Sequence, residues 1–237
     1  MARLCYKELR LYYSLRARNR RTFVHNTNTW FANPDGSYHS RPPATQPGGT
    51  TVHIGAFCSW DRIKTMVPQD SELIFVMGGT NDLGQVMRDL AWVAVSVVDT
   101  AWAADATYYN GGDFNISSFK GAVASTILKL QIWCPNARLV FASPLSGRGT
   151  TSGVNMTEPV YTNGFTTKDY RDAIEEVCIY MSTEFTDVFA KTGINQFNRI
   201  QYITDSVHPY SVAGKKALAA AVVGSLKNIF LASDLIY

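Results

Sequence analysis

The stretch "SELIFVMGGTNDLG", residues 71–84, decides the fold of this chain. Its apolar run from Leu73 to Met77 is uninterrupted, which is typical of a strand covered on both faces in a parallel sheet. The run ends at two glycines, and Asn81 and Asp82 follow shortly after them. Taken alone, this ending fits two interpretations. It is either a common Gly/Asn turn, or a strand end that presents Asn81 as a hydrogen-bond donor.

Helix and strand patterns alternate along much of the remaining chain, as they do in proteins with a parallel sheet covered by helices. The helical segments space apolar residues at intervals of three and four, and the strands are continuous apolar runs. Pro135 ends one helical pattern, and Thr166 or Thr167 is suited to cap another. The expected strands are 50–57, 72–79, 137–144 and 187–193, and the expected helices are 117–135, 166–185 and 211–231.

Two segments rich in Pro, Gly, Ser and Thr, residues 30–50 and 145–164, are expected to be irregular. The second follows a strand, and long loops after strands are where open α/β sheets bind ligands. No internal linker divides the chain. We therefore expect a basic N-terminal arm with an irregular loop over residues 1–49 and one α/β domain over residues 50–237.

The composition is that of a globular protein, with 46% hydrophobic and 17% charged residues among 237. The longest apolar stretch, residues 90–98, is too short to span a bilayer, so we expect no membrane association. The N-terminal segment carries charges throughout and has no apolar signal-peptide core. The default location is therefore the cytoplasm, and secretion stays open if the protein begins upstream of Met1.

The four cysteines are widely spaced, which predicts free thiols and no metal site.

The formal charge of +3 is unevenly distributed. Residues 1–21 hold seven Lys or Arg and one Glu, whereas the remainder holds fifteen basic and eighteen acidic residues. A basic arm can bind nucleic acid. This arm lacks the glycine or aromatic interleaving of RNA-binding segments, however, so a solvated terminal segment is the favoured interpretation and nucleic acid is not an expected partner.

A second motif, "DSVH", places Asp205 three residues before His208, immediately ahead of the last predicted helix. Histidine is the side chain whose ordinary pKa suits a general base near neutral pH. An aspartate on the same turn can orient its ring, and an amide such as that of Asn81 can stabilise an oxyanion. Each motif alone arises easily by chance. Their conjunction, at the ends of consecutive α/β units, favours a site for acyl transfer.

This conjunction resembles the SGNH, or GDSL, hydrolase family over residues 50–231. The third block of that family is GxND, here Gly79 to Asp82, and its fifth is DxxH, here Asp205 to His208. The resemblance implies a three-layer α/β/α sandwich with a flavodoxin-like parallel sheet. It also implies a serine-type ester hydrolase that needs no cofactor, and a substrate that is a small ester or an acylated carbohydrate. Asn81 would be an oxyanion donor supported by Gly79, His208 the base and Asp205 its orienting partner.

The family's nucleophile block, Gly-Asp-Ser, is absent from the sequence, and so is GxSxG. Three explanations are open. The serine could precede Met1 in a longer protein. Ser14, in the apolar segment 9–15, could replace it, although Tyr13 stands where the family has aspartate. The domain could also be catalytically degenerate and bind a carbohydrate or ester without hydrolysis. Cys58 and Ser59, in the region of the second block, are weaker nucleophile candidates.

Overall fold

The computed structural model describes the residues of a main sheet, its helices and a second, small sheet. They are residues 30–32, 38–39 and 50–52, for which the backbone is described, and 57–58, 63–64, 66–80, 82, 114, 118–146, 164–203 and 207–229. The basic arm predicted at residues 1–21 lies outside them.

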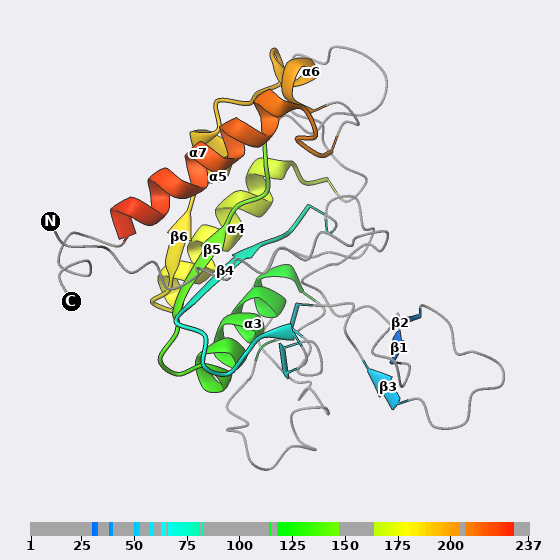
Figure 1. Cartoon of the computed structure of the whole chain (residues 1–237), viewed down its shortest axis with the longest axis vertical. Coiled ribbons are helices and arrows are strands. Elements are labelled where there is room, and N and C mark those ends of the chain that lie inside the picture. The colour runs from blue at the N-terminus through cyan, green and yellow to red at the C-terminus, as the bar shows by residue number, and fades with distance from the viewer. Residues whose placement is uncertain are drawn as a thin grey trace, which may run out of the picture.

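Among the described residues, a parallel sheet of three strands lies between the helices (Figure 1). β4 spans Leu73–Met77, β5 spans Arg138–Ala142 and β6 spans Glu184–Thr186, and their order across the sheet is β4-β5-β6. Both pairings are parallel, so the carboxyl ends of the strands lie along one edge of the sheet. We call this edge the carboxyl edge. The strands predicted at 72–79 and 137–144 are confirmed.

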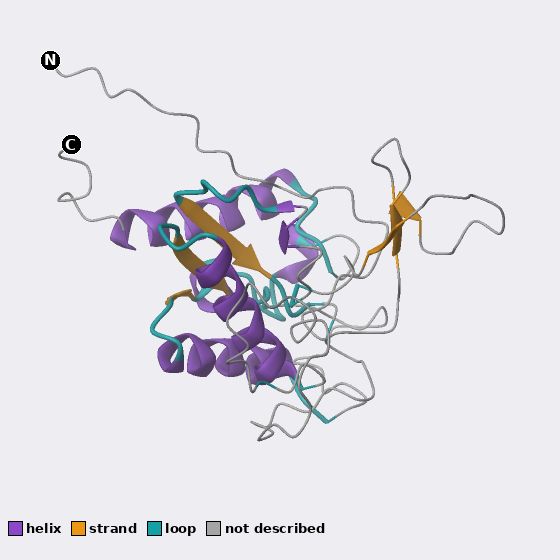
Figure 2. Ribbon diagram, turned by 90° about the horizontal axis from the view of Figure 1, so that it is seen from below, coloured by secondary structure: helices purple, strands orange, loops and turns teal. Residues whose placement is uncertain are grey.

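Helices cover both faces of the sheet, which gives the molecule three layers (Figure 2). Side chains alternate along β4, so that Ile74 and Val76 join one apolar core while Phe75 and Met77 pack against the other. The first core contains residues of α3 and α4, and the second contains residues of α5 and α7. The helices whose bounds the structure describes are α3 (Phe119–Trp133), α4 (Thr167–Tyr180), α5 (Val188–Lys191), α6 (Arg199–Tyr202) and α7 (Val212–Ile229). The predicted α/β/α sandwich is confirmed.

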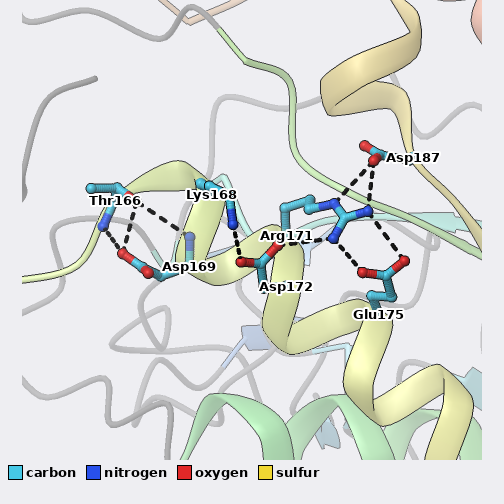
Figure 3. Close-up of polar contacts among 7 residues, drawn as sticks. All are labelled: Thr166, Lys168, Asp169, Arg171, Asp172, Glu175 and Asp187. Carbon is cyan, nitrogen blue, oxygen red and sulfur yellow. Dashed lines mark hydrogen bonds and ion pairs between the residues drawn. The ribbon is translucent and has the colours of Figure 1, made fainter. Parts of the chain in front are cut away.

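The helix predicted at 166–185 is α4, and its apolar stripe faces the core, with Tyr170 and Ile174 fully buried. Thr166 is its N-cap. The hydroxyl of Thr166 accepts from the backbone N–H of Asp169 at 3.3 Å, and the Asp169 carboxylate accepts from the backbone N–H of Thr166 at 2.6 Å (Figure 3). This reciprocal capping box fixes the start of the helix.

Arg171 joins α4 to the end of β6 (Figure 3). Its Nε and Nη2 donate to Oδ2 of Asp187 at 3.0 and 2.7 Å, and it also donates to Asp172 and Glu175. Its guanidinium carbon lies 5.3 Å from the centre of the Phe185 ring. Burial lowers the pKa of Arg171, but the hydrogen bonds to the three carboxylates outweigh burial and the net pKa is raised. This cation therefore ties a helix to a strand at the carboxyl edge.

The small sheet corrects the expectation that residues 30–50 are irregular. β1 (Trp30–Ala32) pairs antiparallel with β2 (Tyr38–His39) and with β3 (Thr50–Val52). The sequence between β1 and β2 contains Pro-Asp-Gly, and such a turn sequence between aromatic stretches is a hairpin signal. The strand predicted at 50–57 is present as β3 over three residues, in this antiparallel sheet and not in the parallel one.

The strand predicted at 187–193 is wrong. β6, Glu184–Thr186, precedes this range, and α5, Val188–Lys191, occupies most of it. Asp187 gives the physical reason. Its Oδ1 accepts from the backbone N–H of Ala190 at 3.0 Å, which caps a helix start and ends the strand.

Candidate active site

Gly79 and Asp82 close a turn directly after β4. Gly79 has φ +92°, in the left-handed region that favours glycine. The backbone N–H of Asp82 donates to the carbonyl oxygen of Gly79 at 3.1 Å, and such a bond between the first and fourth residues closes a β-turn. In the sequence Asn81 lies between Thr80 and Asp82. It lies outside the described residues, so its role as a hydrogen-bond donor stays a prediction.

The first turn of α3 and the first two turns of α4 pack against this turn. A Cβ placed on Gly79 would lie 3.2 Å from Cζ of Phe119 and 3.6 Å from Cδ1 of Ile174. The hydroxyl of Tyr170 donates to the carbonyl oxygen of Asp82 at 3.3 Å, and its ring meets Phe119 edge to face with centroids 4.7 Å apart. Asp82 is completely buried. The turn is therefore fixed to the core, as a preorganised oxyanion donor requires.

His208 lies in the segment that leads into α7, the helix predicted at 211–231. Its side chain is exposed, as that of a base must be to reach a bound ester. Ser211 caps the helix, because its Oγ accepts from the backbone N–H of Gly214 at 3.0 Å. Asp205 lies outside the described residues, and its contact with His208 stays a prediction.

The turn after β4 and the His208 segment lie at the same end of the main sheet. The strands point toward the carboxyl edge, and α7 runs back along the sheet from that end (Figure 1). Gly79 and His208, more than a hundred residues apart in sequence, thus reach the edge at which open α/β sheets bind ligands.

Cys58 is not a suitable nucleophile. Its side chain is 1% exposed within the first core. Its carbonyl oxygen accepts from Nζ of Lys129 in α3 at 2.7 Å, and Lys129 is itself fully buried. The contact fixes the segment that resembles the family's second block. Ser14 and Ser59 lie outside the described residues.

Two buried polar side chains, those of Tyr170 and Lys129, bind backbone carbonyl groups of distant segments, and the sequence pattern did not identify either contact. Tyr170 falls on the apolar face of the helix predicted at 166–185, and Lys129 lies within the helix predicted at 117–135. A signal was present in each case, because a tyrosine or a lysine on an apolar helix face needs a partner for its polar atom. The partner itself, a backbone carbonyl from a distant segment, has no sequence signature.

Within the described ranges, no group of three or more His, Cys, Asp or Glu side chains is placed to hold a metal ion. The acidic side chains of Asp172, Glu175 and Asp187 do gather, and all three bind the guanidinium of Arg171. No helix in the described part of the chain is long and apolar enough to cross a membrane.

No protein-family model matches the chain, and no curated protein matches it significantly. A solved structure from Lactobacillus plantarum is 22% identical, with a TM-score of 0.54 over 71% of this chain and 72% of that one. A second crystal structure is 23% identical, with a TM-score of 0.54 over 74% of this chain and 72% of that one. A protein from Bacteroides uniformis described as a GDSL-like lipase is 18% identical, with a TM-score of 0.46 over 88% of this chain and 66% of that one.

At these identities the likeness concerns the fold alone, and the two matches with the higher TM-score carry it. It agrees with the architecture of the main sheet, whose parallel strands lie between α3 and α4 on one face and α7 on the other. The chain therefore has the three-layer α/β fold that its resemblance to the SGNH, or GDSL, hydrolases predicted.

Proposed function

We propose that the chain hydrolyses esters by the serine mechanism of the SGNH hydrolases. The observation that carries this proposal is the turn closed by Gly79 and Asp82. Two helices pack against it at the carboxyl edge, and α7, which follows the His208 segment, runs back along the sheet from the same end. A turn fixed in this way can hold the Asn81 amide in place before the substrate arrives, and preorganised donors are usually the largest single contribution to catalysis of this kind.

In the proposed reaction a serine hydroxyl attacks the ester carbonyl carbon and His208 takes the proton. Asn81 donates to the oxyanion, while Asp205 orients the ring of His208 and stabilises its charged form. The alcohol leaves with the proton returned by His208, and an acyl-enzyme remains. Water, deprotonated by the same base, then releases the acid and frees the serine. Within this chain Ser14 is the first candidate for the nucleophile and Ser59 a weaker one, and a serine ahead of Met1 in a longer protein is the alternative.

The proposed substrates are small esters and acylated carbohydrates. The family resemblance supports this class, and so does the exposed position of His208, which an ester on the surface of a larger molecule can reach.

The test is the hydrolysis of p-nitrophenyl acetate by the parent chain and by His208→Ala. We expect the substitution to lower kcat/KM about a thousandfold, since a general base contributes on the order of 100- to 10,000-fold. Asn81→Ala should cost about 100- to 1000-fold, the usual effect of one oxyanion donor. His39→Ala serves as the matched control, because His39 lies in the small sheet, and it should leave the rate unchanged.

Ser14→Ala tests the nucleophile in the same assay. Residues that act as one catalytic unit lose activity to similar extents when removed singly, so a loss equal to that of His208→Ala assigns Ser14. The absent Gly-Asp-Ser block favours a second candidate function, the binding of an ester or carbohydrate without hydrolysis. Equal rates for the parent and His208→Ala would contradict the hydrolase and favour that alternative.

A further inference from the structure

Tyr210 lies flat against the ring of His208. The two ring centroids are 4.9 Å apart and the ring planes differ by 20°. The backbone N–H of Tyr210 donates to the carbonyl oxygen of His208 at 2.8 Å, which closes a three-residue turn around Pro209. Proline fixes its own φ, so this turn is stiff. The ring of Tyr210, which this turn holds in place, therefore covers one face of the His208 imidazole.

The backbone on the other side of Tyr210 is fixed as well. The hydroxyl of Ser211 lies 3.0 Å from the carbonyl oxygens of both Gln201 and Tyr202 at the end of α6. Gly214, in the first turn of α7, approaches the same place so closely that a Cβ on it would lie 2.4 Å from the carbonyl oxygen of Tyr202. The backbone that follows Tyr210 is thus held between the end of α6 and the start of α7.

A stacked ring can hold the plane of an exposed histidine that acts as a base, beside the hydrogen bond proposed from Asp205. Rotation about the last side-chain bond of histidine is broad and weakly restricted, whereas proton transfer requires a nitrogen aimed at the nucleophile. The stacked ring of Tyr210 excludes orientations of the imidazole that would clash with it. A misplacement of about 1 Å in a catalytic group can cost on the order of a hundredfold in rate.

We propose that Tyr210 is a positioning residue for His208, with its ring and not its hydroxyl setting the plane of the imidazole. This inference rests on the proposed function, since it assigns a role in the same site. If this is so, an aromatic ring without the hydroxyl is sufficient at position 210 for the normal rate of hydrolysis. Loss of the ring should slow the chemical step more than it weakens substrate binding.

The kinetic test compares Tyr210→Ala and Tyr210→Phe on p-nitrophenyl acetate. We expect Tyr210→Ala to lower kcat about ten- to a hundredfold with KM nearly unchanged, and Tyr210→Phe to stay within about twofold of the parent because the ring face is kept. Tyr180→Ala is the matched control. Tyr180 is 69% exposed at the end of α4, Tyr210 is 55% exposed, and neither substitution should change the thermal unfolding temperature noticeably.

The second measurement does not depend on turnover. A stacked tyrosine shifts the ring-proton resonances of its neighbour, and the His208 resonances are identified by their loss in His208→Ala. We expect Tyr210→Ala to move them, and Tyr210→Phe and Tyr180→Ala to leave them in place. Unmoved resonances, or a fully active Tyr210→Ala beside a slow His208→Ala, would overturn the positioning role alone. A fully active His208→Ala would instead overturn the proposed function, and the positioning role with it.

Discussion

Gly79 is the residue on which the geometry of the candidate site depends most directly. Its φ of +92° is one that other residues adopt only under strain, and the ring of Phe119 occupies the space beside it. We expect Gly79→Ala to lower the free energy of unfolding by about 1–3 kcal/mol, because backbone strain and a crowded Cβ add together. Urea unfolding followed by circular dichroism measures the change.

Gly224 provides the control for this substitution. It lies exposed within α7, and a Cβ on it would have no neighbour within 4 Å. Gly224→Ala should therefore raise stability by about 0.5–1 kcal/mol, the helix preference of alanine over glycine. A Gly79→Ala variant as stable as the parent would show that the turn is not held as described.

Residue-level prediction from the sequence succeeded where a residue type has few alternatives. A glycine pair after an apolar run predicts a turn at a strand end, and Gly79 occupies one. The stacking of Tyr210 on His208 could not be predicted in the same way. The side chains of residues two apart meet only when a tight turn at the residue between them brings them together, and the sequence does not show that turn.

At the scale of elements, Arg171 is the link between α4 and β6. We expect Arg171→Leu to lower the free energy of unfolding by about 1–3 kcal/mol, since hydrogen bonds to charged groups are worth about that much when partly shielded from water. The substitution leaves Asp187, which is 18% exposed, without its cation. Lys168→Leu is the control. Lys168 pairs with Asp172 at the surface, where ion pairs contribute little, and its loss should be barely measurable.

Acidification should reduce the difference in the free energy of unfolding between Arg171→Leu and the parent. Burial raises the pKa of Asp172, but hydrogen bonds from Lys168 and Arg171 outweigh it, so this pKa lies below its ordinary value. A lowered aspartate pKa stabilises the fold above the unfolded value of about 3.9, and that contribution is lost as the pH falls through the folded value. Urea unfolding of both proteins at pH 7 and below pH 4 measures this difference. A difference in the free energy of unfolding that grows on acidification would contradict the prediction.

The longer elements were predictable because their periodicity repeats. The stripes of α3 and α4 and the apolar runs of β4 and β5 each extend over enough residues to show a pattern. β6 and α5 are too short for a pattern, having three and four residues, and the capping bond of Asp187 decides where one ends and the other begins. β1 and β2 have three and two residues, which is too few for an alternating pattern to be recognised in the sequence.

At the scale of the whole molecule, the first core joins three segments that are distant in sequence, and each brings a buried thiol. Cys58 comes from the segment resembling the second block, Cys134 from the end of α3 and Cys178 from α4. Burial raises the pKa of the Cys178 thiol to about 12, with the charge of Glu175 adding to it. Burial also raises the pKa of Cys134, assisted by Asp70.

A thiol reagent should therefore report on the integrity of the core. A Cys5→Ser variant retains only these three thiols, and we expect it to react with Ellman's reagent at pH 8 no faster than the chain unfolds. Thiolates are the reactive form, and burial suppresses both their formation and their access. The three thiols should become reactive together over the same urea range as the loss of circular dichroism, because one core holds them. Rapid reaction of Cys58 in the native protein would contradict the burial described for it, and would restore that thiol as a candidate nucleophile beside His208.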